Sequence, residues 1–332
     1  MTTRILFIER KPTLFVSIEK VFRSIASSLP CQRFSYAFQQ ASYGNDLVSV
    51  CKNLLLFKKE PADIYHVTGH THYLALLLPV ERTVLTIHDL GFLHTRRGIR
   101  RYILKKLLLD WPVSRLRYVT AVSEATKSEI IQNLPSAASK IRVIANPVGD
   151  QYVNNAPKEF NAACPVILQL GTMDNKNVPN LIRSLDGINC RLRIIGPLSD
   201  KIKKALELSN IDVENIEKLG DDEIIEAYRN ADIIAFCSTF EGFGLPIIEG
   251  QAMQKPVVTS NISPMLEVAG YAAEFVDPHD TASIRSGIRR IIEDPENRAR
   301  LIELGVKNVK RFDAKTIAAS YAELYDEVTT AL

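Results

Sequence analysis

Two glutamates eight residues apart carry the clearest chemical signal in this sequence. Glu241 and Glu249 bracket two glycines, and the apolar run ADIIAFCS at 231–238 precedes them. A β-branched, uncharged run of this kind is typical of a strand buried on both faces. Open α/β sheets bind ligands at the carboxyl ends of such strands. We therefore expect Glu241 to lie in a ligand-binding loop that follows the strand.

The residues after Glu241 predict a helix start that suits an anion. Pro246 fits the first helical position, because its fixed φ matches a helix and its missing N–H needs no partner there. Free N–H groups at a helix start favour phosphate, and Gly242 and Gly244 let the backbone approach a ligand closely. Two carboxylates above such a start suit a ligand that is part sugar and part phosphate. The alternative is an ordinary loop whose glycines only form the turn.

Length and composition limit the classes of protein that the chain can represent. Its 332 residues suffice for two domains of about 150 residues each, and 46% hydrophobic with 24% charged residues is typical of a globular protein. No run reaches the ~20 apolar residues that span a bilayer, and the early charges in MTTRILFIERKP argue against a secretion signal. The five cysteines are scattered without CxxC spacing, which favours a reducing cytoplasm over disulfides or zinc.

Charge is distributed unevenly along the chain. Residues 1–150 contain 21 Lys and Arg against 11 Asp and Glu, whereas residues 151–332 contain 20 against 27. The two parts therefore carry net charges of +10 and −7, which add to the +3 of the whole chain. We expect the basic part to face an anionic partner.

A basic stretch at 94–111 concentrates this charge among leucines and isoleucines. Its cations are Arg96, Arg97, Arg100, Arg101, Lys105 and Lys106. A basic, amphipathic segment can lie on an anionic membrane surface at the inner leaflet, and a domain helix with a solvated basic face explains the same pattern. Nucleic acid is disfavoured as the partner, because the stretch lacks interleaved surface aromatics and a reading motif. The expected location is the cytoplasm, with peripheral membrane contact under the first interpretation.

Strand-like and helix-like segments alternate in both halves of the chain. Strands are expected at 4–9, 63–68, 83–89, 117–123, 141–146, 166–172, 190–196, 216–220, 231–238 and 255–260. Helices are expected at 18–27, 99–110, 124–133, 178–185, 201–208, 221–230, 281–293, 295–312 and 314–330. The unpatterned stretch 146–165, rich in Pro, Asn and Gly, has the composition of a linker. Alternation of this kind predicts an α/β fold with parallel sheets covered by helices on both faces, here as two Rossmann-like domains facing a central cleft.

Taken together, these features resemble the retaining GT-B glycosyltransferases, specifically the large family-4 group. EGFGLPIIE at 241–249 matches the group's Glu-x7-Glu motif, and LQLGTMDNKNVPNLIRSL at 168–185 is similar to its donor-phosphate segment. HDL at 88–90 resembles its N-terminal histidine motif, and AAEFVDPHD at 272–280 fits its C-terminal pattern. The resemblance implies an acceptor-binding domain at 1–155, a nucleotide-sugar-binding domain at 156–313 and a helix at 314–332 that returns to the first domain.

The resemblance also implies roles for individual residues. Glu249 would hydrogen-bond the ribose hydroxyls of a nucleotide-diphosphate sugar, and Glu241 would hold the transferred sugar. Lys176 would neutralise the leaving diphosphate, and His88 would lie near the reacting centre. The other donor-binding positions would be Gly171, Thr172, Gly242, Phe243, Gly244 and Leu245.

The chemistry implied by the resemblance is metal-independent transfer of a hexose to a glycan or lipid-linked acceptor in surface polysaccharide assembly. No acidic DxD pair of the metal-dependent transferases occurs. Two departures from the family pattern stand out: Thr172 and Asn175 take the places where the family often has Arg, and residues 9–22 lack its Gly-Gly turn. A catalytically weak nucleotide-sugar-binding partner subunit is therefore one alternative. The other is a sugar-nucleotide epimerase of the same fold, which would keep a nucleotide cleft.

Three histidines near VTGHTH at 67–72 need a separate interpretation. His66, His70 and His72 would need a fourth ligand and a closed site to hold a metal ion, and none is evident. We expect them instead at a strand end that faces the cleft, where one of them could contact the acceptor. His88 also has a structural alternative, a hydrogen bond to a neighbouring loop.

Overall fold

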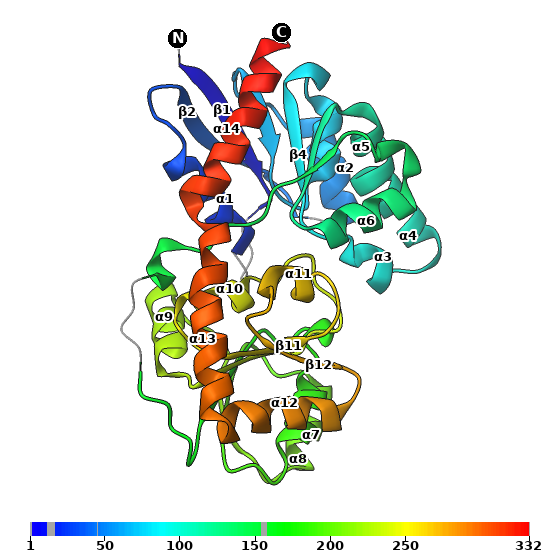
Figure 1. Cartoon of the computed structure of the whole chain (residues 1–332). Coiled ribbons are helices and arrows are strands. Elements are labelled where there is room, and N and C mark those ends of the chain that lie inside the picture. Colours follow the sequence, from blue (N-terminus) through cyan, green and yellow to red (C-terminus); the bar gives the residue numbers. More distant parts are fainter. Residues whose placement is uncertain (1, 12–16, 45, 154–157, 332) are drawn as a thin grey trace. The chain divides into compact units, whose positions relative to one another are not determined.

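The chain forms two compact units of α/β structure. The computed structural model describes residues 2–11, 17–44, 46–153 and 158–331. Unit 1 comprises Met1–Pro147 and Asp313–Leu332, and unit 2 comprises Val148–Phe312. Each unit is built on a six-stranded parallel sheet with helices on both faces (Figure 1), which confirms the predicted fold class. The segment 9–22, which lacks the family's glycine turn, includes residues 12–16, and the predicted linker 146–165 includes residues 154–157. Both of these short stretches lie outside the described ranges.

The sheet of unit 1 runs in the order β2-β1-β3-β4-β5-β6. Its strands are β1 (Thr3–Glu9), β2 (Phe34–Gln40), β3 (Ile64–Val67), β4 (Thr83–Ile87), β5 (Tyr118–Ala121) and β6 (Ile141–Val143). Side chains alternate between the two faces of a strand, yet β3 and β4 are buried at every position. Strands that are apolar on both faces require helices on both faces of the sheet.

The helices of unit 1 come from both ends of the chain. They are α1 (Ser17–Ser28), α2 (Leu47–Leu56), α3 (Gly91–Thr95), α4 (Gly98–Lys105), α5 (Trp111–Arg115), α6 (Glu124–Asn133) and α14 (Ala314–Thr330). Helices α1 and α14 pack against each other, and α14 (red in Figure 1) also contacts β3. The predicted helix 99–110 divides into α4 and a π-helical turn at Lys106–Asp110.

An aromatic cluster holds α14 against unit 1. The imidazole of His66 on β3 lies between Tyr325 Oη and Thr86 Oγ1, both 2.7 Å away. The rings of Phe22 on α1 and Tyr321 on α14 lie 5.0 and 5.4 Å from that of His66. The predicted return of the last helix to the first domain is therefore confirmed by its own contacts.

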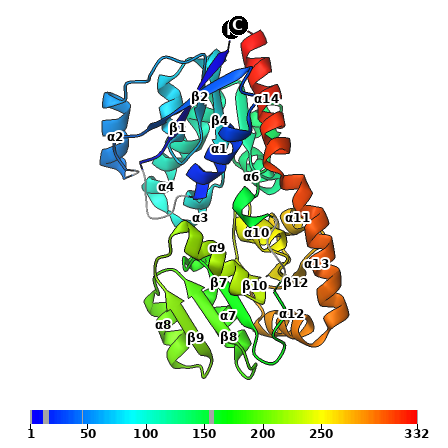
Figure 2. The same cartoon turned by 90° about the vertical axis from the view of Figure 1, so that its left-hand side faces the viewer.

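The sheet of unit 2 runs in the order β12-β11-β10-β7-β8-β9. Its strands are β7 (Val166–Leu170), β8 (Arg191–Ile195), β9 (Asp212–Ile216), β10 (Ile233–Phe236), β11 (Val257–Ser260) and β12 (Glu274–Val276). Its helices are α7 (Val178–Leu185), α8 (Asp200–Glu207), α9 (Asp221–Asn230), α10 (Leu245–Ala252), α11 (Met265–Ala269), α12 (Thr281–Glu293) and α13 (Pro295–Val309). Figure 2 shows the sheet with β7, β8, β9 and β10 adjacent, and α7 packs against both α8 and α12.

The strand predicted at 216–220 is wrong in its position. The structure places β9 at Asp212–Ile216, at the edge of the sheet. The sequence there, DVENI, is polar and its side chains are at most half-buried. An edge strand of this kind lacks the apolar run that identifies a buried strand, so the pattern did not show it.

Candidate functional site

Two loops meet at the carboxyl ends of the neighbouring strands β7 and β10. Strand order continues from β7 through β8 and β9 on one side, and through β10, β11 and β12 on the other. The chain therefore reverses direction in the sheet between β7 and β10, and ligands of open α/β sheets bind at such a point. The loop after β7 carries Lys176, and the loop after β10 carries Glu241.

Lys176 and Glu241 form an ion pair across these two loops. Lys176 Nζ lies 2.6 Å from Glu241 Oε1, and the side chains are 13% and 14% exposed. The ammonium group also lies 4.6 Å from the ring centroid of Phe236, within the range of a cation–π interaction. A partly desolvated pair of this kind is screened less by salt than an exposed pair. The structure thus brings together two residues that lie 65 positions apart in the sequence.

Asn175 fastens the two loops to each other. Its carbonyl accepts a hydrogen bond from the backbone N–H of Thr239 at 2.8 Å. Its side-chain Nδ2 donates to the carbonyl of Phe240 at 2.8 Å and to Oε1 of Glu241 at 3.1 Å. From the sequence, Asn175 was notable only as the residue in place of a family Arg. In the structure its hydrogen bonds hold the loop after β7 against the loop after β10.

Gly171 leaves room for the side chain of Lys176. Its φ of +82° lies in the left-handed region that favours glycine. A Cβ atom at this position would lie 3.2 Å from Cε of Lys176. The absence of a side chain at Gly171 therefore lets the lysine stem reach Glu241.

The start of α10 follows the two glycines as expected, with a shift of one residue. The helix begins at Leu245, so Pro246 is its second residue and not its first. Gly244 precedes it with a φ of +113°, which a side chain would disfavour. The ring of Phe243 is buried against Phe312, with ring centroids 5.6 Å apart. Phe243 can therefore contribute to a donor site only through its backbone.

Glu249 lies one turn into α10 and is held by a tyrosine from α9. The hydroxyl of Tyr228 donates to Oε2 of Glu249 at 2.5 Å. The ring of Tyr152 packs edge-on against that of Tyr228, with centroids 5.3 Å apart. Burial raises the pKa of Tyr228 well above its usual value, and the charge of Glu249 adds to this increase. Tyr228 is therefore a neutral donor, and no sequence motif indicated it.

The side chain of Thr172 lies close to Gly196, the residue that follows β8. A Cβ atom on Gly196, which follows β8, would lie 3.0 Å from Oγ1 of Thr172. Thr172 also lines a small pocket of about 130 Å³ beside Asp174 and Lys201. Asp174 and Lys201 form an exposed ion pair at 2.8 Å. The structure therefore does not place the side chain of Thr172 with Lys176 and Glu241 in one hydrogen-bonded group.

In unit 1, His88 directly follows β4 and is buried. Burial lowers the pKa of His88 to about 3, and the nearby His70 contributes to the decrease. The imidazole is therefore neutral at physiological pH. Since the carbonyl of Thr68 lies 2.9 Å from Nε2, Nε2 carries the hydrogen and donates it. Within the described part of the chain, Nδ1 of His88 makes no hydrogen bond.

The other histidines of unit 1 do not share one exposed edge. His66 lies inside β3 and is fully buried, so its expected position at a strand end was wrong. His72 is also buried, and its Nδ1 donates to the carbonyl of Leu108 at 2.6 Å. Of His66, His70 and His72, only His70 is half-exposed, and its Nε2 lies 3.9 Å from Oδ2 of Asp89. Over residues 2–11, 17–44, 46–153 and 158–331, no group of three or more His, Cys, Asp or Glu side chains could hold a metal ion.

The basic stretch of unit 1 separates into an exposed part and a paired part. Arg96, Arg97, Arg100 and Arg101 are exposed. Lys105 and Lys106 instead lie 2.7 and 2.9 Å from the carboxylate of Asp110. Among the helices that the structure describes, none is long and apolar enough to cross a membrane.

Comparison with known proteins places the chain in a family. The family model of glycosyltransferase family 4 matches residues 31–152, and that of the glycosyl transferases group 1 matches residues 153–308. The O-antigen chain mannosyltransferase B of Escherichia coli is 27% identical over 277 residues, which are 75% of this chain and 70% of that protein.

Two solved structures share the fold at low identity. Sucrose-phosphate synthase from Thermosynechococcus elongatus has a TM-score of 0.81 and 17% identity, with 99% of this chain and all of that chain covered. Anabaena HepE, solved with UDP and glucose, has a TM-score of 0.77 and 17% identity, with 98% of this chain and all of that chain covered. The two family models together match residues 31–308 without a gap, and the chain therefore belongs to the group 1 glycosyltransferases of the GT-B fold.

Proposed function

We propose that this chain transfers a hexose from a nucleotide-diphosphate sugar to a glycan or lipid-linked acceptor, with retention of the anomeric configuration. The observation that carries the proposal is the Lys176–Glu241 ion pair at the reversal point of the unit 2 sheet. A cation beside a carboxylate matches the two parts of the donor, because a diphosphate attracts positive charge and sugar hydroxyls need acceptors. The similarity to an O-antigen chain mannosyltransferase supports surface polysaccharide biosynthesis as the setting.

In this proposal Lys176 acts on the leaving group. Glu241 holds the ammonium group of Lys176 in position at 2.6 Å, and a bound diphosphate would share that group. The free N–H groups at the start of α10 add positive potential to the same region. Together they would stabilise the charge that develops on the diphosphate as its bond to the sugar breaks.

Glu241 and Glu249 are proposed to bind different parts of the donor. Glu241 would accept hydrogen bonds from hydroxyls of the transferred sugar, and Glu249 from the ribose hydroxyls. Tyr228 fixes Oε2 of Glu249, so the direction of this carboxylate is set before a ribose arrives. Backbone groups of Gly171, Thr172 and 242–245 would surround the diphosphate. Through Nδ1, the neutral His88 would accept a hydrogen bond from a sugar hydroxyl.

In the proposed transfer step one bond breaks and one bond forms at the anomeric carbon. The bond between the anomeric carbon and the diphosphate oxygen breaks, and the acceptor oxygen bonds to that carbon from the same face. The acceptor proton passes to an oxygen of the leaving diphosphate. Because no side chain takes the proton, the protein contributes mainly by positioning and by stabilising charge.

No metal ion has a role in this scheme, since Lys176 and the start of α10 supply the positive charge. A chelator should therefore leave the rate of transfer unchanged. Loss of activity in EDTA that magnesium restores would contradict this part of the proposal.

We also propose that the protein is cytoplasmic and peripheral at the inner face of the membrane. The support is the group of exposed arginines at the start of the basic stretch, Arg96, Arg97, Arg100 and Arg101. Clustered cations attract anionic headgroups within about a Debye length of the surface. Lys105 and Lys106 contribute less to this attraction than the arginines, because Asp110 neutralises part of their charge.

The function is tested first by screening UDP-, GDP-, ADP- and dTDP-sugars for thermal stabilisation. A donor at 100 times its Kd should stabilise the protein by about 2.7 kcal/mol. Product analysis with and without an acceptor then separates the alternatives, because an epimerase changes the sugar nucleotide with no acceptor present. A partner subunit without catalysis would keep its cellular role after Glu241→Ala, whereas a transferase would lose it.

A further inference from the structure

Helix α2 of unit 1 has apolar side chains on two opposite faces. One face packs on the core: Val50 is buried, Leu54 and Phe57 are partly buried, and Asn53 Nδ2 donates to Tyr73 Oη at 2.8 Å. The opposite face carries Val48, Cys51, Leu55 and Leu56, all exposed to solvent. Val48 is 64% exposed and Leu55 is 83% exposed. A helix that is apolar all round is normally covered on all sides.

The charges within α2 and just after it are positive, and the nearest acids in the sequence are Asp46, which caps the start of the helix, and Glu60, which follows Lys59. Residues 47–59 contain the cations Lys52, Lys58 and Lys59 and no Asp or Glu, and all three lysines are exposed. A second copy of the same face would bring like charges together, which is unfavourable. A surface of anionic headgroups over an apolar interior complements both features.

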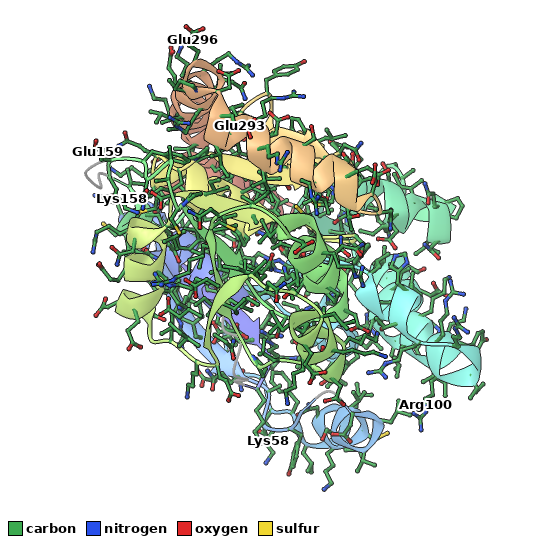
Figure 3. All side chains as sticks on the ribbon, turned by 90° about the horizontal axis from the view of Figure 1, so that it is seen from below. Lys58, Arg100, Lys158, Glu159, Glu293 and Glu296 are labelled. Atoms are coloured by element: carbon green, nitrogen blue, oxygen red, sulfur yellow. The ribbon has the colours of Figure 1, made fainter. Side chains whose placement is uncertain are left out.

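Helix α4 continues the same kind of surface. It has no buried residue, and Ile99 and Tyr102 are exposed between its arginines, with Ile99 69% exposed. The 3-10 helix His72–Leu77 contacts both α2 and the π-helical turn that follows α4. In Figure 3, Lys58, just after α2, and Arg100, on α4, lie on the outside of unit 1.

We propose that the outer face of α2 inserts into an anionic lipid bilayer, with the lysines of α2 and the arginines of α4 placed at the headgroups. The occupant is the lipid surface itself and not a protein partner. This extends the membrane part of the proposed function, and it holds or fails independently of sugar transfer. The outer face of α2 in this proposal means Val48, Cys51, Leu55 and Leu56.

Cys51 gives a direct probe of insertion. It lies within the outer face and is exposed, as is Cys31 in the turn before β2. An environment-sensitive fluorophore on Cys51, in a Cys31→Ser background, should shift to the blue when vesicles of phosphatidylglycerol and phosphatidylcholine are added. The matched protein, labelled on Cys31 in a Cys51→Ser background, should show no shift. No shift at Cys51, or an equal shift at both positions, would overturn the proposal.

Substitutions then separate insertion from electrostatic attraction. Leu55→Ser with Val48→Ser should weaken partition into these vesicles roughly 10-fold or more, because two exposed apolar side chains lose their lipid environment. The difference should persist at high salt, which screens charge but not apolar insertion. Leu208→Ser, at a leucine of unit 2 that is 81% exposed, is the control and should leave the partition unchanged.

The remaining outcomes are also decisive. If the double variant partitions as the unchanged protein does, α2 does not insert and only charge attracts the protein to lipid. If the Cys51 fluorophore shifts with protein concentration alone and sedimentation shows a dimer, a second copy covers α2 and the lipid proposal is wrong. Sugar transfer to a soluble acceptor serves as a separate readout, and the double variant should retain it.

Discussion

The hydroxyl of Tyr228 lies 2.5 Å from Oε2 of Glu249 and connects α9 to α10. Tyr228 is fully buried and neutral, so it can only donate to the carboxylate. A hydrogen bond to a charged group stabilises its geometry by about 1.5–3 kcal/mol. The direction in which Glu249 presents its remaining oxygen therefore depends on a residue outside the binding motif.

Tyr228→Phe should raise the KM for the nucleotide-sugar donor by roughly 10-fold or more, with kcat little changed. The phenyl ring keeps the packing against Tyr152, and only the hydrogen bond that orients Glu249 is lost. An interaction made equally in the ground and transition states affects KM and not kcat. Steady-state kinetics against donor concentration measures this, with Tyr271→Phe at an exposed tyrosine as the control. A fall in kcat at unchanged KM would contradict the proposed positioning role.

Lys176→Met should lower kcat/KM for the donor by roughly 100- to 1000-fold, the range seen when one stabilising donor of transition-state charge is removed. The reason is that the diphosphate would lose the ammonium group next to it. The control is Lys307→Met, since Lys307 forms an exposed ion pair with Glu303 on α13. Retention of more than half of the activity by Lys176→Met would remove Lys176 from the mechanism.

The same pair gives a prediction about stability. Lys176→Met alone leaves Glu241 as a partly buried charge without its cation, and Glu241→Gln alone leaves Lys176 in that state. Each change should cost about 1–3 kcal/mol of unfolding free energy. The double variant should cost less than the two single changes added together, because neither charge is then left unpaired. Urea unfolding of the four proteins measures the coupling, and strict additivity would show that the pair contributes nothing.

Gly171→Ala should impair donor binding, whereas Gly187→Ala should not. Both glycines have a positive φ, +82° and +74°, so alanine should cost about 1–2 kcal/mol of stability at either position. Only at Gly171 would the new methyl group press on the stem of Lys176, since nothing lies within 4 Å of a Cβ on Gly187. Thermal unfolding and donor titration of the two variants separate strain from the effect on the site. Equal donor affinity in both would contradict the role given to Gly171.

Stability should fall as the pH decreases below about 6.5. Burial lowers the pKa of His66 and His88 to about 3 and that of His72 to about 4. The unfolded chain therefore binds protons between pH 6.5 and these values while the native state does not, so stability is full above 6.5 and is lost below it. At pH 5.5 the loss should be about 4 kcal/mol for the three together.

Urea unfolding at pH 7.5 and 5.5 measures this loss. His66→Gln should lower stability at pH 7.5 but reduce the pH dependence by about one third, because one of the three buried imidazoles is removed. Equal stability at the two pH values would show that these histidines are protonated in the native state.

Three helices that begin at a capping residue were predicted with the bounds that the structure has. The expected bounds 124–133, 281–293 and 314–330 are those of α6, α12 and α14. Each helix follows a residue whose side chain caps it: Ser123 accepts from the N–H of Thr126, and Asp280 and Asp313 do the same at the other two. A local hydrogen bond fixes such a boundary, so local sequence contains the information.

Three of the four edge strands were not predicted in the same way. No strand was expected at β2 or β12, and β9 was misplaced by several residues. All three are edge strands, and β2 and β9 have mostly half-buried or exposed side chains. Their pairing depends on a neighbouring strand and not on an apolar run of their own.

The site was predictable only to the extent that it follows one motif. The spacing of Glu241, Gly244 and Glu249 placed them on one loop and one helix, and the parallel sheet then placed Lys176 beside Glu241. The contact between Tyr228 and Glu249 depends on how α9 packs against α10, which local sequence does not contain. The outer face of α2 was not predicted either, because no helix was expected at Leu47–Leu56.

The return of α14 to unit 1 has a consequence for biosynthesis. Unit 2 is one uninterrupted stretch, Val148–Phe312, whereas unit 1 needs Asp313–Leu332 as well as Met1–Pro147. All residues of unit 2 are therefore synthesised before Tyr321 and Tyr325 of α14, whose side chains contact His66. Nascent chains usually complete their N-terminal domain first. Here the last residues that unit 1 needs are synthesised after all of unit 2, so unit 1 cannot complete its own core before the whole of unit 2 has been made.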